Sequence, residues 1–374
     1  MNTYAINRTG DFVTDGILLA LPLCFPGQSL PPPADETRID AMAEDADAMA
    51  IYLGTGGRAA HAMMAATHAD SGIVHDLGTI PGADRVDAIG VGEERVCFVA
   101  SGPQGSAVWS HPRHGGTGFL IQEWGLTRVG VRKVCDLFPD RRVAHAVFTP
   151  EDCLHGITEG DGQFFTLDLA VETPEPVVVG PVHPPSLNPK DGPHQPFFSP
   201  RLVLDHSGRV WGTSGSARLW HYDPATGKLV LWGPRVPAAA GREAHTTVSA
   251  WAVSPSDGMI YGGTSPDGFF FKFDPRTLQM TPLGKPTRLD EIHCLSVGSD
   301  GRVYGMAGGE EDIGHLFVYD PASGALVDLG VPVSTLSTRQ YGYHFRSALT
   351  AAGGELYFGQ HERASHLWLY FPSR

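Results

Sequence analysis

Four-stranded units that repeat along the chain predict an all-β fold, a seven-bladed β-propeller of four-stranded blades formed by residues 1–374 as a single domain. The clearest unit, 291–330, contains four short β-like segments separated by an Asp-Gly turn, a Gly/Glu loop and a Pro-Ala-Ser-Gly turn. The two units before it repeat the same order of strands and turns. Composition agrees, because only 18% of the residues are charged, while 46 glycines and 30 prolines supply turns.

Recurring signals mark the units in order. In the three clear units the third strand ends on an aromatic residue followed by Asp and Pro, at 222–224, 273–275 and 319–321. Asp and Pro favour a turn at these points. The stretch from Thr37 to Met49 is the one segment that looks helical. A glycine closes each of six units, at intervals of 46 to 55 residues by subtraction: Gly78, Gly125, Gly180, Gly233, Gly284 and Gly330.

The seventh unit is incomplete at its C-terminal end. It begins near Tyr343 and ends after its third strand. We expect the N-terminal segment around Gly16 to Leu23 to supply the missing fourth strand, because this pairing closes the ring.

Charge and apolar runs narrow the range of partners. The formal net charge is −14, which disfavours electrostatic binding to nucleic acid or anionic membranes. No stretch reaches the ~20 apolar residues of a membrane helix, and the apolar run Gly16–Cys24 follows no clearly positive leader. The five cysteines are widely spaced and suit free thiols. We therefore expect a soluble, cytoplasmic protein without nucleic-acid or membrane partners.

Histidines recur in one phase of five consecutive units, near the start of the strand that lines the channel of a propeller. Converging imidazoles can bind a divalent cation such as Mn²⁺, Fe²⁺ or Zn²⁺, with Ca²⁺ as a further candidate. Alternatively, the protein needs no cofactor and one histidine acts as a general base, or the rings bond only to water and backbone. These histidines lie 48 to 51 residues apart by subtraction: His145, His194, His245, His293 and His344.

The last unit gathers a phenol, an imidazole and a guanidinium within residues 341–346. Arg can hold a substrate carboxylate while Tyr or His moves the adjacent proton. Loops returning to the same end supply His61, Gln360, His361 and Glu362. The predicted catalytic residues are His245, His293, Tyr343, His344 and Arg346. The predicted substrate-binding residues are Arg201, Arg288, His194, His361 and Tyr341.

These repeats and this final unit resemble the seven-bladed propeller enzymes that process uronic-acid-containing glycans: oligogalacturonate lyase, the ulvan lyases, the rhamnosyl-glucuronate lyases and related α-L-rhamnosidases. The resemblance to oligogalacturonate lyase implies manganese held by histidines and a glutamine. Gln340 and His344 are similar to part of that ligand run, and Arg346 stands where the family has a further histidine. The metal ligands implied are thus His145, His194, His245, His293, Gln340 and His344.

The predicted function is a carbohydrate-active lyase that cleaves a uronic-acid-containing oligo- or polysaccharide by β-elimination at the channel mouth. One alternative is a glycoside hydrolase on the same substrates, with Glu310, Glu311 or Glu362 activating water. Another is a non-enzymatic propeller that binds a protein partner. A third is a lyase acting on a cyclic ester or antibiotic with Mg²⁺.

Overall fold

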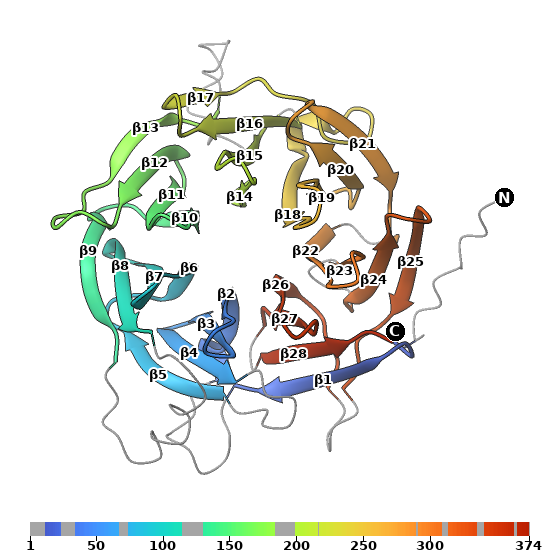
Figure 1. Ribbon diagram of the computed structural model, residues 1–374, viewed down its shortest axis with the longest axis horizontal. Coiled ribbons are helices and arrows are strands. Elements are labelled where there is room, and N and C mark those ends of the chain that lie inside the picture. Colours follow the sequence, from blue (N-terminus) through green and yellow to red (C-terminus); the bar gives the residue numbers. More distant parts are fainter. Residues whose placement is uncertain are drawn as a thin grey trace.

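Seven four-stranded antiparallel sheets form a ring around a central channel, which confirms the predicted fold class (Figure 1). The computed structural model describes residues 12–23, 34–66, 74–113, 130–183, 199–215, 217–288, 291–308, 313–334, 340–362 and 365–373. Within these residues the other regular elements are two single-turn 3₁₀ helices, η1 (Ala34–Glu36) and η3 (Glu243–His245). None of the helices in the described ranges is long and apolar enough to span a bilayer.

Each blade runs from an innermost strand at the channel to an outermost strand at the rim. Blade 1 contains β2 (Arg38–Asp45), β3 (Ala50–Gly56), β4 (Ala60–Ala66) and β5 (Val74–Ile80). Blade 2 contains β6 (Arg85–Val91), β7 (Arg95–Gly102), β8 (Gly105–Pro112) and β9 (Arg132–Phe138). Blade 3 contains β10 (Val143–Phe148), β11 (Cys153–Thr158), β12 (Gln163–Asp168) and β13 (Val177–Pro181).

The remaining blades follow the same order. Blade 4 contains β14 (Val203–Leu204), β15 (Val210–Ser214), β16 (Arg218–Asp223) and β17 (Lys228–Val230). Blade 5 contains β18 (Thr247–Val253), β19 (Ile260–Ser265), β20 (Phe270–Asp274) and β21 (Gln279–Gly284). Blade 6 contains β22 (Glu291–Val297), β23 (Val303–Gly308), β24 (His315–Asp320) and β25 (Ala325–Gly330). Blade 7 contains β26 (Phe345–Thr350), β27 (Leu356–Gln360), β28 (His366–Phe371) and, from the other end of the chain, β1 (Ile17–Pro22).

Pairing of the two chain ends closes the ring, as predicted. Strand β1 lies antiparallel to β28, with Ile17 opposite Phe371 and Pro22 opposite His366 (Figure 1). The alternating apolar residues of β1, Leu18 and Ala20, join the core between blades 6 and 7. The N-terminal strand therefore contributes both backbone hydrogen bonds and buried apolar surface to blade 7.

Two sequence predictions within the blades are wrong. The stretch from Thr37 to Met49 is not a helix, because Arg38–Asp45 forms β2 and pairs with β3. Gly125 lies outside the described residues, and the outermost strand of blade 2 is β9, which starts after it at Arg132. The fourth strand of this unit therefore follows Gly125 in the sequence, and Gly125 does not close the unit.

Four of the other five recurring glycines have a backbone reason. Gly78, Gly180, Gly284 and Gly330 all have positive φ, between 102° and 152°, in outermost strands. At each of them the register against the third strand slips by one residue. Glycine adopts this conformation without a Cβ clash, so each marks a β-bulge that bends the rim of its blade.

A second set of bulges lies on the innermost strands and positions the functional groups. In six blades the register against the second strand skips one residue, which is left unpaired beside the channel. An extra residue in one strand re-aims the local side chains. The skipped residues are Asp40, Asp87, Ala144, Ser249, His293 and Arg346.

Candidate functional site

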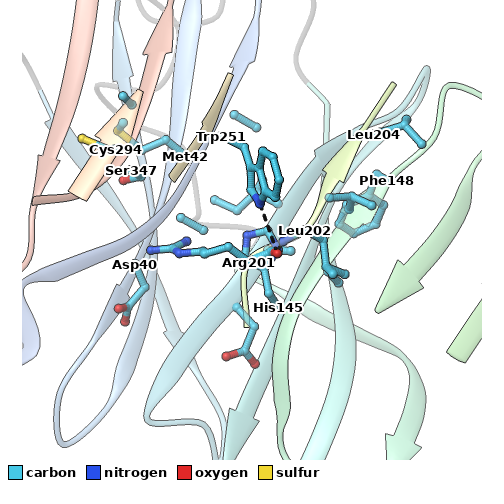
Figure 2. A pocket seen from close by; sticks show the side chains of 18 of the residues that line it. Asp40, Met42, His145, Phe148, Arg201, Leu202, Leu204, Trp251, Cys294 and Ser347 are labelled. Atoms are coloured by element: carbon cyan, nitrogen blue, oxygen red, sulfur yellow. Dashed lines mark hydrogen bonds between the residues drawn. The ribbon is translucent and has the colours of Figure 1, made fainter. Parts of the chain in front are cut away.

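The central channel contains a cavity of about 670 Å³ that is lined by residues from all seven blades. Figure 2 shows Arg201 extending across it toward Asp40, with His145 and Trp251 close by. Its polar lining consists largely of the bulge residues and their neighbours: Asp40, Glu44, Asp87, His145, Thr149, Arg201, Ser249, His293, Arg346 and Ser347.

Two arginines bring positive charge into this cavity. Nη2 of Arg201 donates a hydrogen bond to the main-chain oxygen of Arg346 at 2.9 Å. Burial, reinforced by the charge of Arg346, lowers the pKa of Arg201 to about 9. Arg201 is nevertheless protonated at neutral pH, so the cavity holds two guanidinium cations whose charges repel each other.

Asp40 is the ionised carboxylate that faces these cations. Its Oδ1 lies 3.6 Å from Nε of Arg346 and 3.0 Å from Nδ1 of His361. Burial opposes ionisation, but the close contact with His361 and the charge of Arg346 outweigh it and lower the pKa of Asp40. Its Oδ2 is buried without a hydrogen-bond partner among the described residues.

Asp87 contributes less negative charge to the cavity. Burial raises its pKa to about 7, although Arg85 donates to its Oδ1 at 2.6 Å and Ser101 donates to its Oδ2. The raised pKa and the charge of Arg85 both reduce the negative charge that Asp87 adds to the cavity. Near Arg201 and Arg346 the two guanidinium charges exceed the ionised carboxylate of Asp40, which suits this end of the cavity to an anion, whereas Glu44 adds a carboxylate further along the wall.

Two histidines of the cavity share one arrangement. Nδ1 of His145 accepts the main-chain N–H of Leu202 at 3.3 Å, and Nδ1 of His293 accepts that of Phe345 at 3.4 Å. Burial lowers the pKa of both rings well below 6.5, so both are neutral. In a neutral imidazole whose Nδ1 accepts, the hydrogen is on Nε2. Each ring therefore offers an Nε2–H donor.

A further imidazole pair lies beside His293. The rings of His293 and His344 have centroids 4.2 Å apart, and His361 lies 5.6 Å from His344. Burial, with the charges of His361, Arg346 and Arg201, lowers the pKa of His344 to about 4. The main-chain N–H of His344 donates to the carboxylate of Glu362, which fixes the backbone at this point. His344 is thus uncharged at neutral pH and has a lone pair that can accept a proton.

Metal-ligating groups also meet here. Among the described residues, Glu291, His293 and His344 offer one ligand atom each within 4.8 Å of one another. One carboxylate and two imidazoles suit a divalent transition metal, and Nε2 of His293 is buried without a hydrogen-bond partner. The residues fit such an ion, although a metal at Nε2 would require the ring hydrogen to move to Nδ1 and the weak contact with Phe345 to be lost.

The structure brings together part of the predicted set. Arg201, Arg346, His145 and His293 line the cavity, and His344 and His361 contact its edge. His194 lies outside the described residues, as do Glu310 and Glu311.

Other predicted residues do not line the cavity. His245 is exposed on η3 and Arg288 is exposed in a loop. Tyr343 is 42% exposed, Gln340 is half-buried, and the ring of Tyr341 lies 6.3 Å from that of Phe12. Neither His245 nor Gln340 belongs to the Glu291–His293–His344 group, so among the described residues the predicted five-histidine ring reduces to a smaller cluster.

Sequence reasoning missed three acidic residues of the site, Asp40, Asp87 and Glu291. A signal for the first two is present in the sequence: Arg-Ile-Asp-Ala-Met at 38–42 and Arg-Val-Asp-Ala-Ile at 85–89 are nearly the same pentapeptide. Both lie at the inner-strand bulge of their blades. Aligning blades on this apolar–polar–small pattern, rather than on histidines, finds the channel positions.

No protein-family model matches the chain, and no curated protein matches it. Solved structures do. A streptogramin B lyase is 12% identical, with 96% of this chain and 99% of that chain covered at a TM-score of 0.65. The β-propeller domain of Cps50 (Swd1) from Myceliophteria thermophila is 12% identical, with coverages of 96% and 100% and a TM-score of 0.60. Sqt1 from Saccharomyces cerevisiae is 11% identical, with coverages of 96% and 100% and a TM-score of 0.58.

The chain also spans about 40% of a longer chain, the extracellular domain of a protein described as hybrid two component system BT4673 from B. thetaiotaomicron, at 11% identity and a TM-score of 0.60. These likenesses show the propeller fold. The similar structures belong to proteins that are named for different functions. The fold alone therefore does not identify the activity, which depends on the residues of the site.

Proposed function

We propose that this protein is a carbon–oxygen lyase that performs β-elimination on a carboxylate-bearing substrate in the central channel. One observation carries the proposal: Arg201 and Arg346 place two positive charges at one end of the channel cavity, beside uncharged imidazoles. Uronic-acid-containing oligosaccharides, suggested by the sequence resemblance, are one substrate class with the required carboxylate.

The arginine pair suits the substrate carboxylate. A guanidinium has five N–H donors in a planar fork and binds carboxylates bidentately. Arg201 commits one donor to the Arg346 main chain. Charge neutralisation of the carboxylate lowers the cost of removing the proton on the adjacent carbon, since the developing negative charge spreads onto the bound oxygens.

His344 is the proposed base. It removes the proton next to the carboxylate, the electron pair of that C–H bond forms the C=C bond, and the C–O bond at the β-carbon breaks. The leaving oxygen keeps the bonding pair and takes the proton that His344 has removed, which returns His344 to its neutral form. The charges of Arg201 and Arg346 contribute to the low pKa of His344, so a bound carboxylate that offsets them raises that pKa toward neutrality.

A divalent cation is the alternative use of the same imidazoles. Glu291, His293 and His344 would hold it, and it would supply Lewis-acid stabilisation of the negative charge that develops on the substrate carboxylate. Elemental analysis of the wild type and of a His293→Ala, His344→Ala variant decides between the two uses. A stoichiometric metal that the variant loses replaces the proton-transfer role of His344. No metal in either protein leaves this role in place.

The test of the proposal is product analysis. Uronate oligosaccharides and other carboxylates that bear a β-alkoxy or β-acyloxy group are incubated with the protein, and the ultraviolet absorbance of an unsaturated carboxylate product is followed. Arg346→Gln and His344→Asn should abolish turnover while the fold is retained by circular dichroism, and Arg288→Gln, an exposed residue, serves as control. A saturated product that contains oxygen from isotopically labelled water would instead identify a hydrolase.

The non-enzymatic alternative also has an observation in its favour. Apolar side chains are exposed near the outermost strands of neighbouring blades 3 and 4, with Trp232 at 60% and Val177 at 63%. Such residues are typical of a surface that binds a protein partner. If the protein is such a scaffold, it should turn over no carboxylate, and Arg346→Gln should not change its binding to the protein partner.

A further inference from the structure

Next to the charged groups, the wall of the same cavity is apolar. We infer that the natural ligand joins its carboxylate to a hydrocarbon or aromatic group that occupies this apolar section. This inference rests on the proposed anion site at Arg201 and Arg346. It narrows the substrate class to amphiphilic carboxylates, which include a uronic acid with an alkyl or aryl substituent but not an unsubstituted oligouronate.

Strand geometry produces the apolar section. Successive side chains of a strand alternate in direction, so residue i+2 lines the same wall as residue i. In blades 1, 2, 5, 6 and 7, the innermost strand has a polar bulge residue and, two positions later, an apolar residue that also lines the cavity. The pairs are Asp40 with Met42, Asp87 with Ile89, Ser249 with Trp251, His293 with Leu295 and Arg346 with Ala348.

Three of these side chains pack against the protein on one side and remain accessible on the other. Met42, Ile89 and Trp251 are each half-buried and pack against the core of their blades. Blades 3 and 4 add further apolar residues, Phe148 and Leu204 (Figure 2). Apolar surface that lines a concave cavity beside a few charged groups is the usual composition of a small-molecule site.

Trp251 links the apolar and charged sections. Its Nε1–H donates to the main-chain oxygen of Arg201 at 3.3 Å, which fixes the indole beside the guanidinium-bearing segment. The ring is a large apolar surface with its one polar atom already bonded. A ligand group next to the bound carboxylate therefore meets indole carbon rather than a hydrogen-bonding group.

Charge at the other end disfavours a polyanion. Strand β2 carries Asp40 at the charged section and Glu44 four residues further along the same wall. At the rise of a strand these positions lie roughly 13 Å apart. A chain of uronates along this path would place carboxylates on apolar side chains and then near Glu44, whereas a single-headed amphiphile avoids both costs.

The test is a binding series of linear monocarboxylates measured by isothermal titration calorimetry with the full-length protein. Acetate, butyrate, hexanoate and octanoate share one head group and differ in apolar length. Burial of one methylene corresponds to about a fourfold gain in affinity. We expect the dissociation constant to fall about twofold to fourfold for each added methylene. Trigalacturonate should bind more weakly than octanoate.

Variants locate the effect. Ile89→Asn in the apolar section should reduce the gain in affinity per methylene without changing the affinity for acetate. Met42→Gln should have the same effect and replaces Ile89→Asn if that variant does not fold. Val177→Asn, on the exposed edge strand β13, is the matched control and should leave the series unchanged. Equal affinities along the series, tighter binding of trigalacturonate than octanoate, or an unchanged gain in both cavity variants would overturn the inference. Because binding is measured without turnover, an absence of elimination would defeat the proposed lyase activity and leave this result standing.

Discussion

Replacement of Arg201 with Met should have opposite effects on stability and on ligand binding. Met keeps most of the side-chain volume but removes the charge and the hydrogen bond to the Arg346 main chain. If the arginine pair exists to bind an anion, its charge is unfavourable in the empty cavity and favourable only when a ligand carboxylate is present.

The stability change follows from the pKa. The fall of the Arg201 pKa from 12.5 to about 9 corresponds to roughly 5 kcal/mol of unfavourable charge burial at neutral pH. Water in the channel screens part of this cost, because the side chain is only half-buried. Loss of the hydrogen bond to the Arg346 oxygen costs about 1–3 kcal/mol in return. We expect the ligand-free Arg201→Met variant to be more stable than the wild type by about 1–3 kcal/mol.

Affinity should change in the other direction. A hydrogen bond to a charged group contributes about 1.5–3 kcal/mol, which converts to a loss of roughly 10-fold to 150-fold in the affinity for a carboxylate. Urea unfolding of the ligand-free protein and calorimetric titration with hexanoate measure the two effects. Arg288→Met, at an exposed position, should change neither. A destabilised Arg201→Met variant with unaltered hexanoate affinity would show that Arg201 is a structural residue and refute the reasoning.

Two other predictions concern stability. His344 has a pKa of about 4 in the folded chain against 6.5 as a model value, so the unfolded state binds more protons between these limits. Through this residue, the free energy of unfolding should therefore fall by about 1.4 kcal/mol per pH unit as the pH drops from 6.5 to 4. His344→Asn should reduce the slope of the unfolding free energy against pH by that amount. An unchanged slope would contradict the burial of a neutral ring. Gly262→Ala would place a Cβ 2.1 Å from the ring of buried Phe271, so thermal unfolding should show a loss of about 1–3 kcal/mol; no loss would mean that the blade packs differently.

The fold could be predicted from the sequence because its signals are local and repeated. Each blade carries its own turns, and the aromatic–Asp–Pro endings recur at a fixed place in three of them. The splice of β1 onto β28 followed from counting strands, since seven closed blades need a fourth strand for the last one. These inferences require no knowledge of side-chain direction.

The site was predictable only in part, because it depends on register. Asp40 was missed because the alanine-, methionine- and acid-rich sequence of β2 has helical propensity, which sheet packing overrides. Histidine spacing identified His293, which occupies a bulge, but the same spacing selected His245, which is exposed on η3. A change of one or two residues in loop length moves a side chain off the channel without altering the repeat.

Product analysis of carboxylate substrates in labelled water tests the central claim most directly. Wild-type protein and Arg346→Gln are incubated in heavy-oxygen water with uronate oligosaccharides, octyl uronide and other carboxylates that bear a β-alkoxy or β-acyloxy group, and the products are examined by ultraviolet absorbance and mass spectrometry. The account predicts an unsaturated carboxylate without heavy oxygen from the wild type, and no product from Arg346→Gln. Heavy oxygen in a saturated product, equal turnover by Arg346→Gln, or no turnover of any carboxylate that the wild type binds would contradict it.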